Sequence, residues 1–311
     1  MKILVTGGAG FIGSHLVDRL LLKGESVVCV DNFLLGKKHH LKVALTDDNF
    51  KLCVFDLLDL NELDALFKQE KFDFVYHLAS NSDIKAGVES TNRDLQLTFL
   101  ITYNILECMR KHNVGKILFT SSPAVFGIHN KSLTEDLPMK PESLYGASKL
   151  ASEAYLHAFS SLYNIQTWIL RLSNMVGERT THGILFDFLV KVKNNSKELI
   201  VLGDGNQNKP YMYVQELIDS MFFILENSHE QFNEFNVGPK DGVRVSVIAK
   251  LFLEEFGSGQ KIKYTGGKTG WKGDIPFYSH NSIKLNTLGW EPTLSSKDAV
   301  RKGINKMREE L

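Results

Sequence analysis

Three glycines at intervals of three residues, close to the N-terminus, constrain this chain more than any other feature. The motif TGGAGFIG at residues 6–13 follows the apolar run Ile3–Val5, which is rich in β-branched side chains and predicts a buried strand. Apolar residues then recur with helical spacing up to Leu21. The motif therefore lies where a strand turns into a helix, and its spaced glycines are Gly7, Gly10 and Gly13.

Each glycine of this turn has a separate task in a site for a pyrophosphate. Gly7 permits a tight turn, Gly10 lets the backbone approach the phosphates closely, and Gly13 lets the helix pack against the strand. The N-terminus of the helix adds unpaired N–H groups and the positive end of a dipole, which favour phosphate. The stretch predicts a dinucleotide site; the alternative is a glycine-rich turn that binds no ligand.

An acidic residue ends the next apolar run, Val27–Val30, and bears on the choice of dinucleotide. The Asp31 carboxylate can accept hydrogen bonds from an adenosine ribose, and it would repel the 2′-phosphate of NADP. We therefore predict NAD as the cofactor. The basic cluster Lys-Lys-His-His at residues 37–40 leaves NADP as the alternative, in which these side chains would hold the additional phosphate.

Strand and helix patterns alternate through the first half of the chain. Further strands are expected over residues 51–55, 72–78, 116–120 and 167–172, and helices over 57–67, 95–109 and 145–163. The alternation is typical of an α/β fold, a Rossmann-type doubly wound parallel sheet with helices on both faces. Ligands bind beyond the carboxyl ends of such strands. The polar residues there are Asp31, Asp56, Ser80, Ser121 and Ser122.

The regular alternation fades after about Arg171. A turn is expected at residues 203–206 and a glycine-rich basic loop at 266–273, with helices over 215–226, 245–256, 283–288 and 295–307. We therefore expect residues 1–172 to form an NAD-binding Rossmann domain, to which some later segments return. Residues 173–311 would form a smaller, less regular substrate-binding lobe.

The composition bears on partners and location. The chain has 36 Lys and Arg residues and 36 Asp and Glu residues, so its charge balance indicates neither nucleic acid nor an anionic membrane surface as a partner. No apolar run approaches the ~20 residues of a membrane span. Because only Met1 and Lys2 precede the first strand, we expect no secretion signal. The three cysteines have no metal-type spacing, so we expect free thiols, no metal and a cytoplasmic location.

A tyrosine and a lysine four residues apart, in YGASK at residues 145–149, supply a candidate for proton transfer. This spacing places Tyr145 and Lys149 on one face of a helix. A phenol is a poor base at neutral pH, but a nearby ammonium and a positive nicotinamide ring both favour the phenolate. The pair could then take a proton from a sugar hydroxyl, which a serine at the end of the preceding strand would steady. Otherwise Tyr145 packs in the core and Lys149 is a surface charge.

These motifs together resemble the extended short-chain dehydrogenase/reductase family, in its nucleotide-sugar epimerase/dehydratase branch, and are most similar to UDP-glucose 4-epimerase-like proteins. The resemblance covers nearly the whole chain, and it is the combination of motifs that is specific. It rests on TGGAGFIG (6–13), DN (31–32), DL (56–57), HLA (77–79), TSSPAVFG (120–127), YGASK (145–149), RLSNMVGER (171–179) and GDGNQNKPYMYV (203–214).

The resemblance implies roles for individual residues. Tyr145 would be the base, Lys149 would hold the nicotinamide ribose, and Ser122, which precedes the Val-Phe-Gly tripeptide at 125–127, would assist. The cofactor would be held by Gly7, Gly10, Phe11, Ile12, Asp31, Asn32, Phe33, Asp56, Leu57, Leu78, Ala79, Ser80, Ser121, Tyr145 and Lys149. The nucleotide sugar would be held by Ser122, Asn174, Arg179, Gly183, Leu185, Lys209 and Asp274, with Asn174 on the diphosphate and Asp274 on the nucleotide ribose.

The chain departs from the family pattern at three places. Pro123 and Ala124 occupy the positions of the Asp-Glu pair of family 4,6-dehydratases, so dehydration is disfavoured. Lys209 and Trp271 stand where epimerases often place arginines on the phosphates, with Arg179 and Lys272 as candidate substitutes. An asparagine common near the nicotinamide is replaced by Thr98.

The resemblance implies NAD-dependent oxidation of a nucleoside-diphosphate sugar at C4, most simply by a 4-epimerase that returns the hydride. The alternatives are a net 4-dehydrogenase that releases the keto sugar, a 4,6-dehydratase, and a regulator that binds a dinucleotide without catalysis. Family members commonly form homodimers through a four-helix bundle, here expected from residues 95–112 and 145–163. Two histidines remain to be placed. His77 is expected to be a buried core residue, whereas His182 either lines the substrate site or is exposed to solvent.

Overall fold

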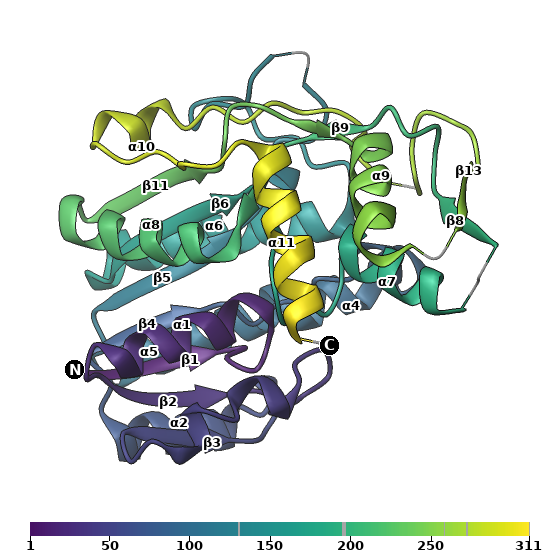
Figure 1. The fold of residues 1–311 in the computed structure, drawn as a ribbon. Helices are drawn as coiled ribbons and strands as arrows, with labels where there is room; N and C mark the ends of the chain where they lie inside the picture. The colour runs from purple at the N-terminus through teal and green to yellow at the C-terminus, as the bar shows by residue number, and fades with distance from the viewer. Residues whose placement is uncertain (130, 195–196, 258, 272, 311) are drawn as a thin grey trace.

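A seven-stranded sheet forms the middle layer of the molecule (Figure 1). The computed structural model describes residues 1–129, 131–194, 197–257, 259–271 and 273–310. All neighbouring strands of this sheet run parallel, in the order β11-β6-β5-β4-β1-β2-β3. The strands are β1 (Lys2–Thr6), β2 (Ser26–Val30), β3 (Phe50–Cys53), β4 (Phe74–His77), β5 (Lys116–Ser121), β6 (Gln166–Leu172) and β11 (Phe232–Val237).

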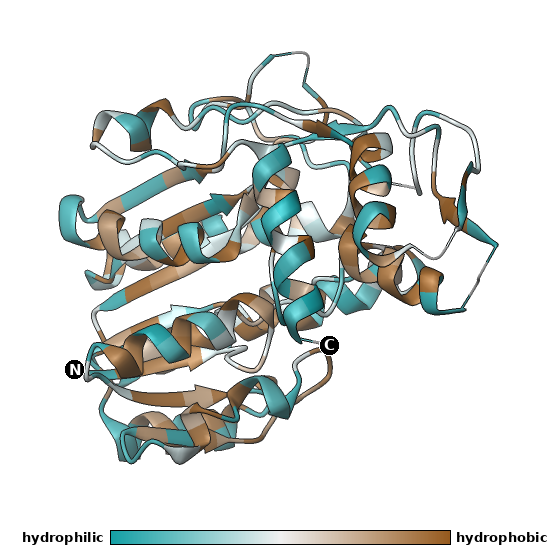
Figure 2. Cartoon of the chain, in the orientation of Figure 1, coloured by the Kyte–Doolittle hydropathy of each residue, from teal (hydrophilic) through white to brown (hydrophobic). Residues whose placement is uncertain are grey.

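Helices cover both faces of the sheet, which explains why its central strands are almost wholly apolar (Figure 2). On one face lie α1 (Phe11–Leu22), α8 (Val214–Asn227) and α10 (Ile283–Thr287), whose apolar side chains share one core with the sheet. On the other face α2 (Leu60–Glu70), α5 (Ile101–Lys111) and α6 (Leu144–Tyr163) enclose a second core. The predicted α/β, doubly wound parallel architecture is confirmed.

The second half of the chain builds a separate group of elements beside the carboxyl edge of the sheet (Figure 1). Its core packs α7 (Ile184–Asn194), α9 (Val245–Phe256) and α11 (Ser296–Glu310) against short strands. These strands pair as β7 (Asn174–Val176) with β10 (Tyr211–Tyr213), β8 (Glu198–Val201) with β13 (Lys261–Tyr264), and β9 (Asn208–Lys209) with β12 (Val243–Arg244).

The remaining elements are short and lie mostly near the carboxyl edge. A π-helical segment, η3 (Leu95–Leu100), precedes α5, so the helix expected over 95–109 has an irregular first half. Before it stand α3 (Ile84–Glu89) and α4 (Thr91–Asp94). Single 3₁₀ turns are η1 (Lys38–Leu41), η2 (Ala44–Thr46) and η4 (Pro123–Val125). The helix α7 and the strand β11 were not expected from the sequence.

One strand of the large sheet comes from late in the chain. β11 pairs with β6 along its whole length, from Phe232 beside Thr167 to Val237 beside Leu172. Helix α8, which precedes β11, covers the same face of the sheet as α1. The chain therefore leaves the sheet at Leu172, builds part of the second group, and returns to complete the sheet.

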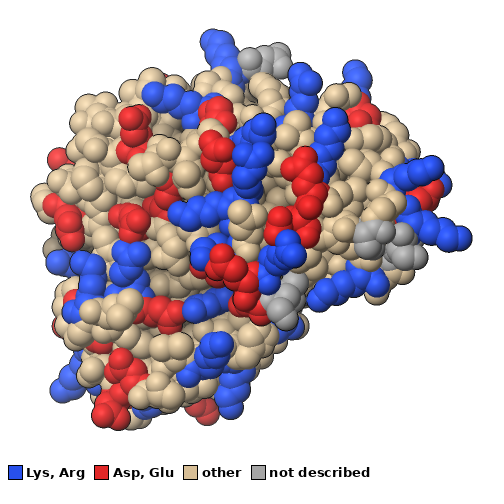
Figure 3. Space-filling view, in the orientation of Figure 1, with Lys and Arg blue, Asp and Glu red and all other residues tan. Residues whose placement is uncertain are grey.

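Three further features of the described residues bear on possible partners: the surface charge, the character of the helices and the grouping of metal-binding side chains. Basic and acidic side chains are interspersed over the face shown in Figure 3. Among the described residues, no helix has the length and apolar character needed to cross a bilayer. Within the same part of the chain, no group of three or more His, Cys, Asp or Glu side chains is arranged to hold a metal.

An ion pair in the interior joins the long helix α6 to the sheet. The Arg171 side chain on β6 is fully buried, and its Nε and Nη2 both donate to the carboxylate of Glu153 on α6, Nη2 at 2.8 Å. Nη2 also donates to Glu234 on β11 at 2.8 Å, and the guanidinium lies 5.1 Å from the ring centroid of Phe126. The Ser121 hydroxyl at the end of β5 donates to Glu153 as well. Three strands are therefore tied to α6 at one point.

Removing Arg171 should destabilise the protein strongly. The substitution Arg171→Met would leave the buried Glu153 carboxylate without its cation, which typically costs about 3–5 kcal/mol in the free energy of unfolding. Urea denaturation followed by circular dichroism measures the change. Lys306→Met, which removes an exposed pair with Glu309 on α11, is the matched control and should cost less than about 1 kcal/mol. Equal effects of the two substitutions would contradict this interpretation.

Candidate active site

A cavity of about 950 Å³ runs along the carboxyl edge of the large sheet and faces the second group of elements. Its lining includes the ends of β1, β2, β4 and β5 on one side and residues before and within α7 on the other. Such an edge is where open α/β sheets bind ligands. Most of the residues predicted for the site line this cavity, namely Gly7, Gly10, Phe11, Ile12, Asp31, Asn32, Asp56, Leu57, Leu78, Ala79, Ser80, Ser121, Ser122, Tyr145, Lys149, Asn174, Gly183, Leu185, Lys209 and Asp274.

The glycine turn between β1 and α1 is as tight as the motif predicted. Gly7 has a φ of +69°, and a Cβ there would lie 2.8 Å from the backbone nitrogen of Ala79. A Cβ on Gly13 would lie 2.2 Å from the carbonyl oxygen of Gly7, so only glycine lets α1 approach the turn. Gly10 is the N-cap residue of α1 and, having no side chain, makes no capping hydrogen bond to the helix. The cradle fits a pyrophosphate, because the first N–H groups of α1 stay available at the cavity.

The acidic residue at the end of β2 is held in place by backbone amides. The Asp31 carboxylate is 8% exposed and accepts hydrogen bonds from the N–H groups of Ala9 at 2.9 Å and Phe33 at 2.8 Å. Burial raises the pKa of this carboxyl group above its ordinary value, and the two amide donors oppose the shift. Next to it the Asn32 amide donates to Asp56 at 2.9 Å. The Phe33 side chain packs against the core and, unlike its neighbours, is not part of the cavity lining.

The basic cluster that could have held an NADP phosphate is turned elsewhere. Lys37, Lys38 and His39 are exposed and do not line the cavity. The imidazole of His40 is buried, and its Nδ1 lies 3.0 Å from the carbonyl oxygen of Ala9. Asp31 is thus the only charged side chain of residues 31–40 on the cavity lining.

Helix α6 begins beside the end of β5 and brings the predicted catalytic residues together. Its N-cap is Ser143, which accepts a hydrogen bond from Gly146 N–H at 3.1 Å. Tyr145 in the first turn is hydrogen-bonded to the Ser122 side chain. One turn further, the ammonium of Lys149 donates to the carbonyl oxygen of Thr120 at 2.7 Å and lies 5.9 Å from the Tyr145 ring centroid. Lys149 is 3% exposed and is therefore not a surface charge.

The electrostatics of this pair differ from the expectation based on the sequence. A lowered phenol pKa was predicted, but burial raises the pKa of Tyr145 to about 12, with the Ser122 hydrogen bond opposing and Asp94 adding to the shift. Burial likewise lowers the pKa of Lys149 to about 7, while Glu153 and Asp94 favour its charged form. The reason is that desolvation outweighs the Ser122 hydrogen bond at Tyr145 and the attraction of Glu153 and Asp94 at Lys149.

Two of the polar residues discussed in the sequence analysis make their hydrogen bonds to buried groups of the protein. Ser121 was expected to contact the cofactor, and it borders the cavity. Its hydroxyl, however, donates a hydrogen bond to the Glu153 carboxylate. His77 is fully buried, as expected, with Nδ1 2.6 Å from the Thr6 hydroxyl and Nε2 3.0 Å from the Thr102 hydroxyl. Burial lowers the pKa of His77 to about 3, which keeps the ring neutral.

The loop after β4 carries polar residues that the sequence did not single out. Asn81 is 1% exposed, and its amide donates to the carbonyl of Asp83 at 3.0 Å and to the Asp94 carboxylate at 2.8 Å. Thr98, in the π-helical segment, lies 3.1 Å from the Ser80 hydroxyl and accepts a hydrogen bond from Asn81 N–H. Thr98, which stands where the family commonly has an asparagine, therefore belongs to a hydrogen-bond network with Ser80 and Asn81. The only sequence signal for Asn81 was its position in the loop that follows the strand predicted over residues 72–78.

The far end of the cavity holds the residues predicted for the nucleotide sugar. Lys209 Nζ pairs with the Asp274 carboxylate at 2.6 Å and lies 5.2 Å from the Trp271 ring centroid. The Asn174 amide donates to the Tyr278 hydroxyl at 3.0 Å. Asp274 therefore neutralises the lysine that stands in place of an arginine, and Lys272, named as a substitute, lies outside the described residues.

Arg179, which the resemblance assigned to the substrate, does not line the cavity. Its φ of +59° turns the chain, and its guanidinium pairs with Asp18 on α1 at 2.7 Å. The backbone N–H of Arg179 donates to Glu310 near the C-terminus at 2.8 Å. The residue joins α1, the loop before α7 and α11, because a carboxylate from each helix is within reach.

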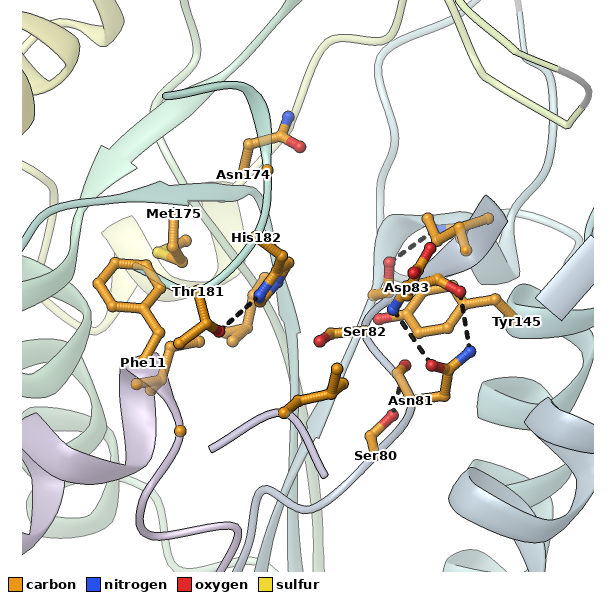
Figure 4. A pocket seen from close by; sticks show the side chains of 18 of the residues that line it. Phe11, Ser80, Asn81, Ser82, Asp83, Tyr145, Asn174, Met175, Thr181 and His182 are labelled. Atoms are coloured by element: carbon orange, nitrogen blue, oxygen red, sulfur yellow. Dashed lines mark hydrogen bonds between the residues drawn. The ribbon is translucent and has the colours of Figure 1, made fainter. Parts of the chain in front are cut away.

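Two loops face each other across the cavity in Figure 4. The segment Ser80, Asn81, Ser82 and Asp83 lies on the same side as Tyr145, and Thr181 and His182 lie opposite, beside Phe11 and Met175. His182 Nδ1 is 3.2 Å from the Thr181 hydroxyl, and the side chain lies across the cavity from Ser82. His182 therefore lines the cavity, which was one of the two expectations for it.

Comparison with known proteins identifies the group to which these features belong. The model of the family described as "NAD dependent epimerase/dehydratase family" matches residues 3–238. The chain belongs to this family. It is 28% identical over 317 residues to a UDP-glucose 4-epimerase of Mycolicibacterium smegmatis, with 99% of each chain covered.

The solved structures that resemble this chain include epimerases of the extended short-chain dehydrogenase/reductase type. It is similar to a crystal structure of a UDP-galactose 4-epimerase, with 34% identity, a TM-score of 0.89 and complete coverage of both chains. It is also similar to a UDP-glucuronic acid 4-epimerase of Bacillus cereus solved with UDP-glucuronic acid and NAD, with 26% identity, a TM-score of 0.90 and complete coverage of both. This epimerase/dehydratase family member is an NAD-dependent enzyme.

The choice of NAD generates a prediction for Asp31. Asp31→Asn should weaken NAD binding about 10- to 100-fold, because a hydrogen bond to a charged group contributes about 1.5–3 kcal/mol. It should weaken NADP binding less, since the carboxylate that repels the 2′-phosphate is gone. Titration of cofactor-free enzyme with each dinucleotide, read by tryptophan fluorescence, measures both constants. Lys38→Gln, an exposed change in the neighbouring basic cluster, is the control. A preference of the unmodified enzyme for NADP would overturn the role given to Asp31.

Proposed function

We propose that this enzyme is a UDP-hexose 4-epimerase. The observation that carries the proposal is the set Ser122, Tyr145 and Lys149, placed by α6 and β5 at the cavity where the glycine turn and Asp31 also face. The three similar proteins described above are 4-epimerases of UDP-sugars, which supports the nucleotide and the position of reaction. Pro123 and Ala124, in place of an acid–base pair, speak against 4,6-dehydration.

Each catalytic residue has a separate task in this proposal. The Tyr145 phenol exchanges a proton with the C4 hydroxyl of the sugar, and Ser122, hydrogen-bonded to Tyr145, holds the same oxygen. Lys149, fixed by the Thr120 carbonyl, binds the ribose next to the nicotinamide and stabilises the phenolate when charged. Bound NAD supplies the acceptor and donor of the C4 hydride. Gly7, Gly10, Asp31 and Asp56 would hold NAD, and Asn174, Lys209 and Asp274 the nucleotide sugar.

The organisation of the chain forms part of the same proposal. We assign residues 1–172 with the returning segments α8 and β11 to the NAD-binding domain, and most of residues 173–311 to the substrate-binding lobe. The three cysteines are free thiols. They support the proposed cytoplasmic location, where thiols stay reduced.

A labelling experiment separates an epimerase from a net 4-dehydrogenase. The purified enzyme is incubated in deuterium oxide with UDP-galactose and no added cofactor, and the products are followed by NMR. We expect UDP-glucose to accumulate over many turnovers with the original hydrogen at C4, because an epimerase returns the hydride it removes. Turnover that stops after one equivalent, with a keto sugar as product, would instead establish the dehydrogenase.

The variant Tyr145→Phe is the matched control for this experiment. It removes one hydroxyl and should lower kcat by roughly 10²–10⁴-fold, the usual contribution of general acid–base catalysis. NAD binding, measured by fluorescence titration, should change little because the ring remains. A variant with nearly normal turnover would exclude Tyr145 as the proton-transfer group.

We further propose a homodimer in which α5 and α6 of two chains form a four-helix bundle. The support is a cluster of exposed apolar side chains on α6 and its neighbours, Leu95, Tyr103, Tyr155, Leu162 and Tyr163. Leu162 is 71% exposed. A cluster of this kind at one helix pair is typical of an interface.

Sedimentation equilibrium tests the homodimer. The unmodified chain should sediment at about twice its mass of 35.1 kDa, and Leu162→Glu should produce the monomer because it places a charge in the apolar interface. Leu22→Glu is the control, since Leu22 is 84% exposed at the end of α1 on the opposite face of the sheet. A monomeric unmodified protein would exclude the four-helix bundle.

A further inference from the structure

The end of the cavity next to Tyr145 lies between the two facing loops of Figure 4. If C4 of the sugar reacts at Tyr145 and Ser122, the sugar ring must lie within a few ångströms of both loops, Ser80–Asp83 after β4 and Thr180–Gly183 before α7. The side chains of these loops therefore contact the substituents of the ring. They decide which sugars fit.

The first loop contributes a carboxylate to this space. Asp83 is the N-cap residue of α3, and its Oδ1 accepts a hydrogen bond from Ala86 N–H at 3.0 Å. This contact fixes the carboxylate on the cavity lining, where it is exposed and carries no ion pair among the described residues. A carboxylate only accepts hydrogen bonds, so it suits the hydroxyl groups of a sugar.

The second loop contributes no permanent cation. His182 faces this space from the opposite side, and desolvation lowers its pKa below the ordinary value although Asp83 favours the protonated form. A neutral imidazole can donate one hydrogen bond and accept another. Thr181, beside it, adds a neutral hydroxyl.

The cationic side chains of the cavity are engaged elsewhere. Lys149 donates to the Thr120 carbonyl and belongs to the catalytic pair, and Lys209 pairs with Asp274 at 2.6 Å. No arginine is present among the described residues that line the cavity. Among the described residues that line the cavity, a carboxylate on the sugar would thus find no free cation, and it would lie near Asp83.

In a 4-epimerase the substituents of the sugar must be accommodated in two orientations. The enzyme must present both faces of C4 to one fixed reacting position, so the ring turns over between the two half-reactions. Turning the ring moves the C6 substituent from the side of one loop to the side of the other. A hydroxymethyl group finds hydrogen-bonding partners on both sides, whereas a carboxylate must pass Asp83 in one of its two positions.

We propose that the sugar site accepts neutral UDP-hexoses and rejects UDP-hexuronic acids, with Asp83 as the residue that determines this specificity. The inference rests on the proposed 4-epimerase and refines its substrate class. It matters because the similar proteins include enzymes named for each class of sugar.

Binding to the catalytically inactive holoenzyme tests the inference independently of turnover. UDP-glucose and UDP-glucuronic acid are titrated by calorimetry into the NAD-loaded Tyr145→Phe variant. UDP-glucose should bind at least about tenfold more tightly, since one like charge a few ångströms away in a wet site has an effect of that order. Equal binding, or tighter binding of UDP-glucuronic acid, would overturn the inference.

Two further substitutions, each added to Tyr145→Phe, assign the effect to these loops. Asp83→Asn keeps the cap of α3 and should tighten UDP-glucuronic acid binding roughly five- to tenfold, while UDP-glucose binding should change less because the amide oxygen still accepts a hydrogen bond. Glu89→Gln, an equal change of charge at the other end of α3, is the control and should alter neither constant. His182→Arg should tighten UDP-glucuronic acid, whereas His182→Gln should not. If Asp83→Asn and Glu89→Gln behave alike, Asp83 is not the determinant.

Turnover distinguishes failure of this inference from failure of the proposed function. The unmodified enzyme is supplied with UDP-galactose and, separately, with UDP-glucuronic acid. Selective binding of UDP-glucose without epimerisation of UDP-galactose would remove the 4-epimerase and retain the neutral-sugar site. Epimerisation of both sugars with similar kcat/KM would retain the 4-epimerase and remove the specificity proposed for Asp83.

Discussion

The buried contact between Arg171 and Glu153 fixes the helix on which the chemistry depends. Helix α6 carries Tyr145 and Lys149, and Glu153 is one turn beyond Lys149 on the same helix. Its carboxylate is held by the guanidinium from β6 and by the Ser121 hydroxyl from β5. Buried ion pairs add little net stability compared with apolar side chains, because desolvation opposes them. The contribution of this ion pair is to positioning, because its fixed geometry determines where α6 lies along the strands β5 and β6.

The same interior that fixes the catalytic residues also works against their charged forms. Burial raises the pKa of Tyr145 to about 12 and lowers the pKa of Lys149 to about 7, so each is moved toward neutrality. The chain opposes this for Lys149 through the carboxylates of Glu153 and Asp94. Asp94 is 1% exposed, and its Oδ2 has no hydrogen-bond partner among the described residues. A positively charged nicotinamide next to Tyr145 would favour the phenolate, so the proton would be released only in the assembled complex.

Local patterns in the sequence predicted the parts of the molecule that local physics determines. The glycine turn, Asp31 and the Tyr145–Lys149 spacing each follow from a few adjacent residues, and each lies at the cavity. Arg179 could not be placed in this way, because its partner Asp18 is far away in the sequence. Strand β11 and helix α7 were missed since mixed polar and apolar runs such as FNEFNV fit several structures until a neighbour is known. The raised pKa of Tyr145 depends on burial, which spacing does not reveal.

Because β11 lies late in the sequence, the large sheet is incomplete while the chain is being synthesised. When a ribosome has made the first 172 residues, every glycine and acidic residue of the NAD cradle already exists, but one edge of the sheet is bare. β6 then presents unpaired N–H and C=O groups next to apolar side chains, until residues 232–237 emerge and cover it. Such an open edge attracts other extended chains. The order of synthesis therefore gives the nascent chain an interval of vulnerability, which ends only when its own later half closes the sheet.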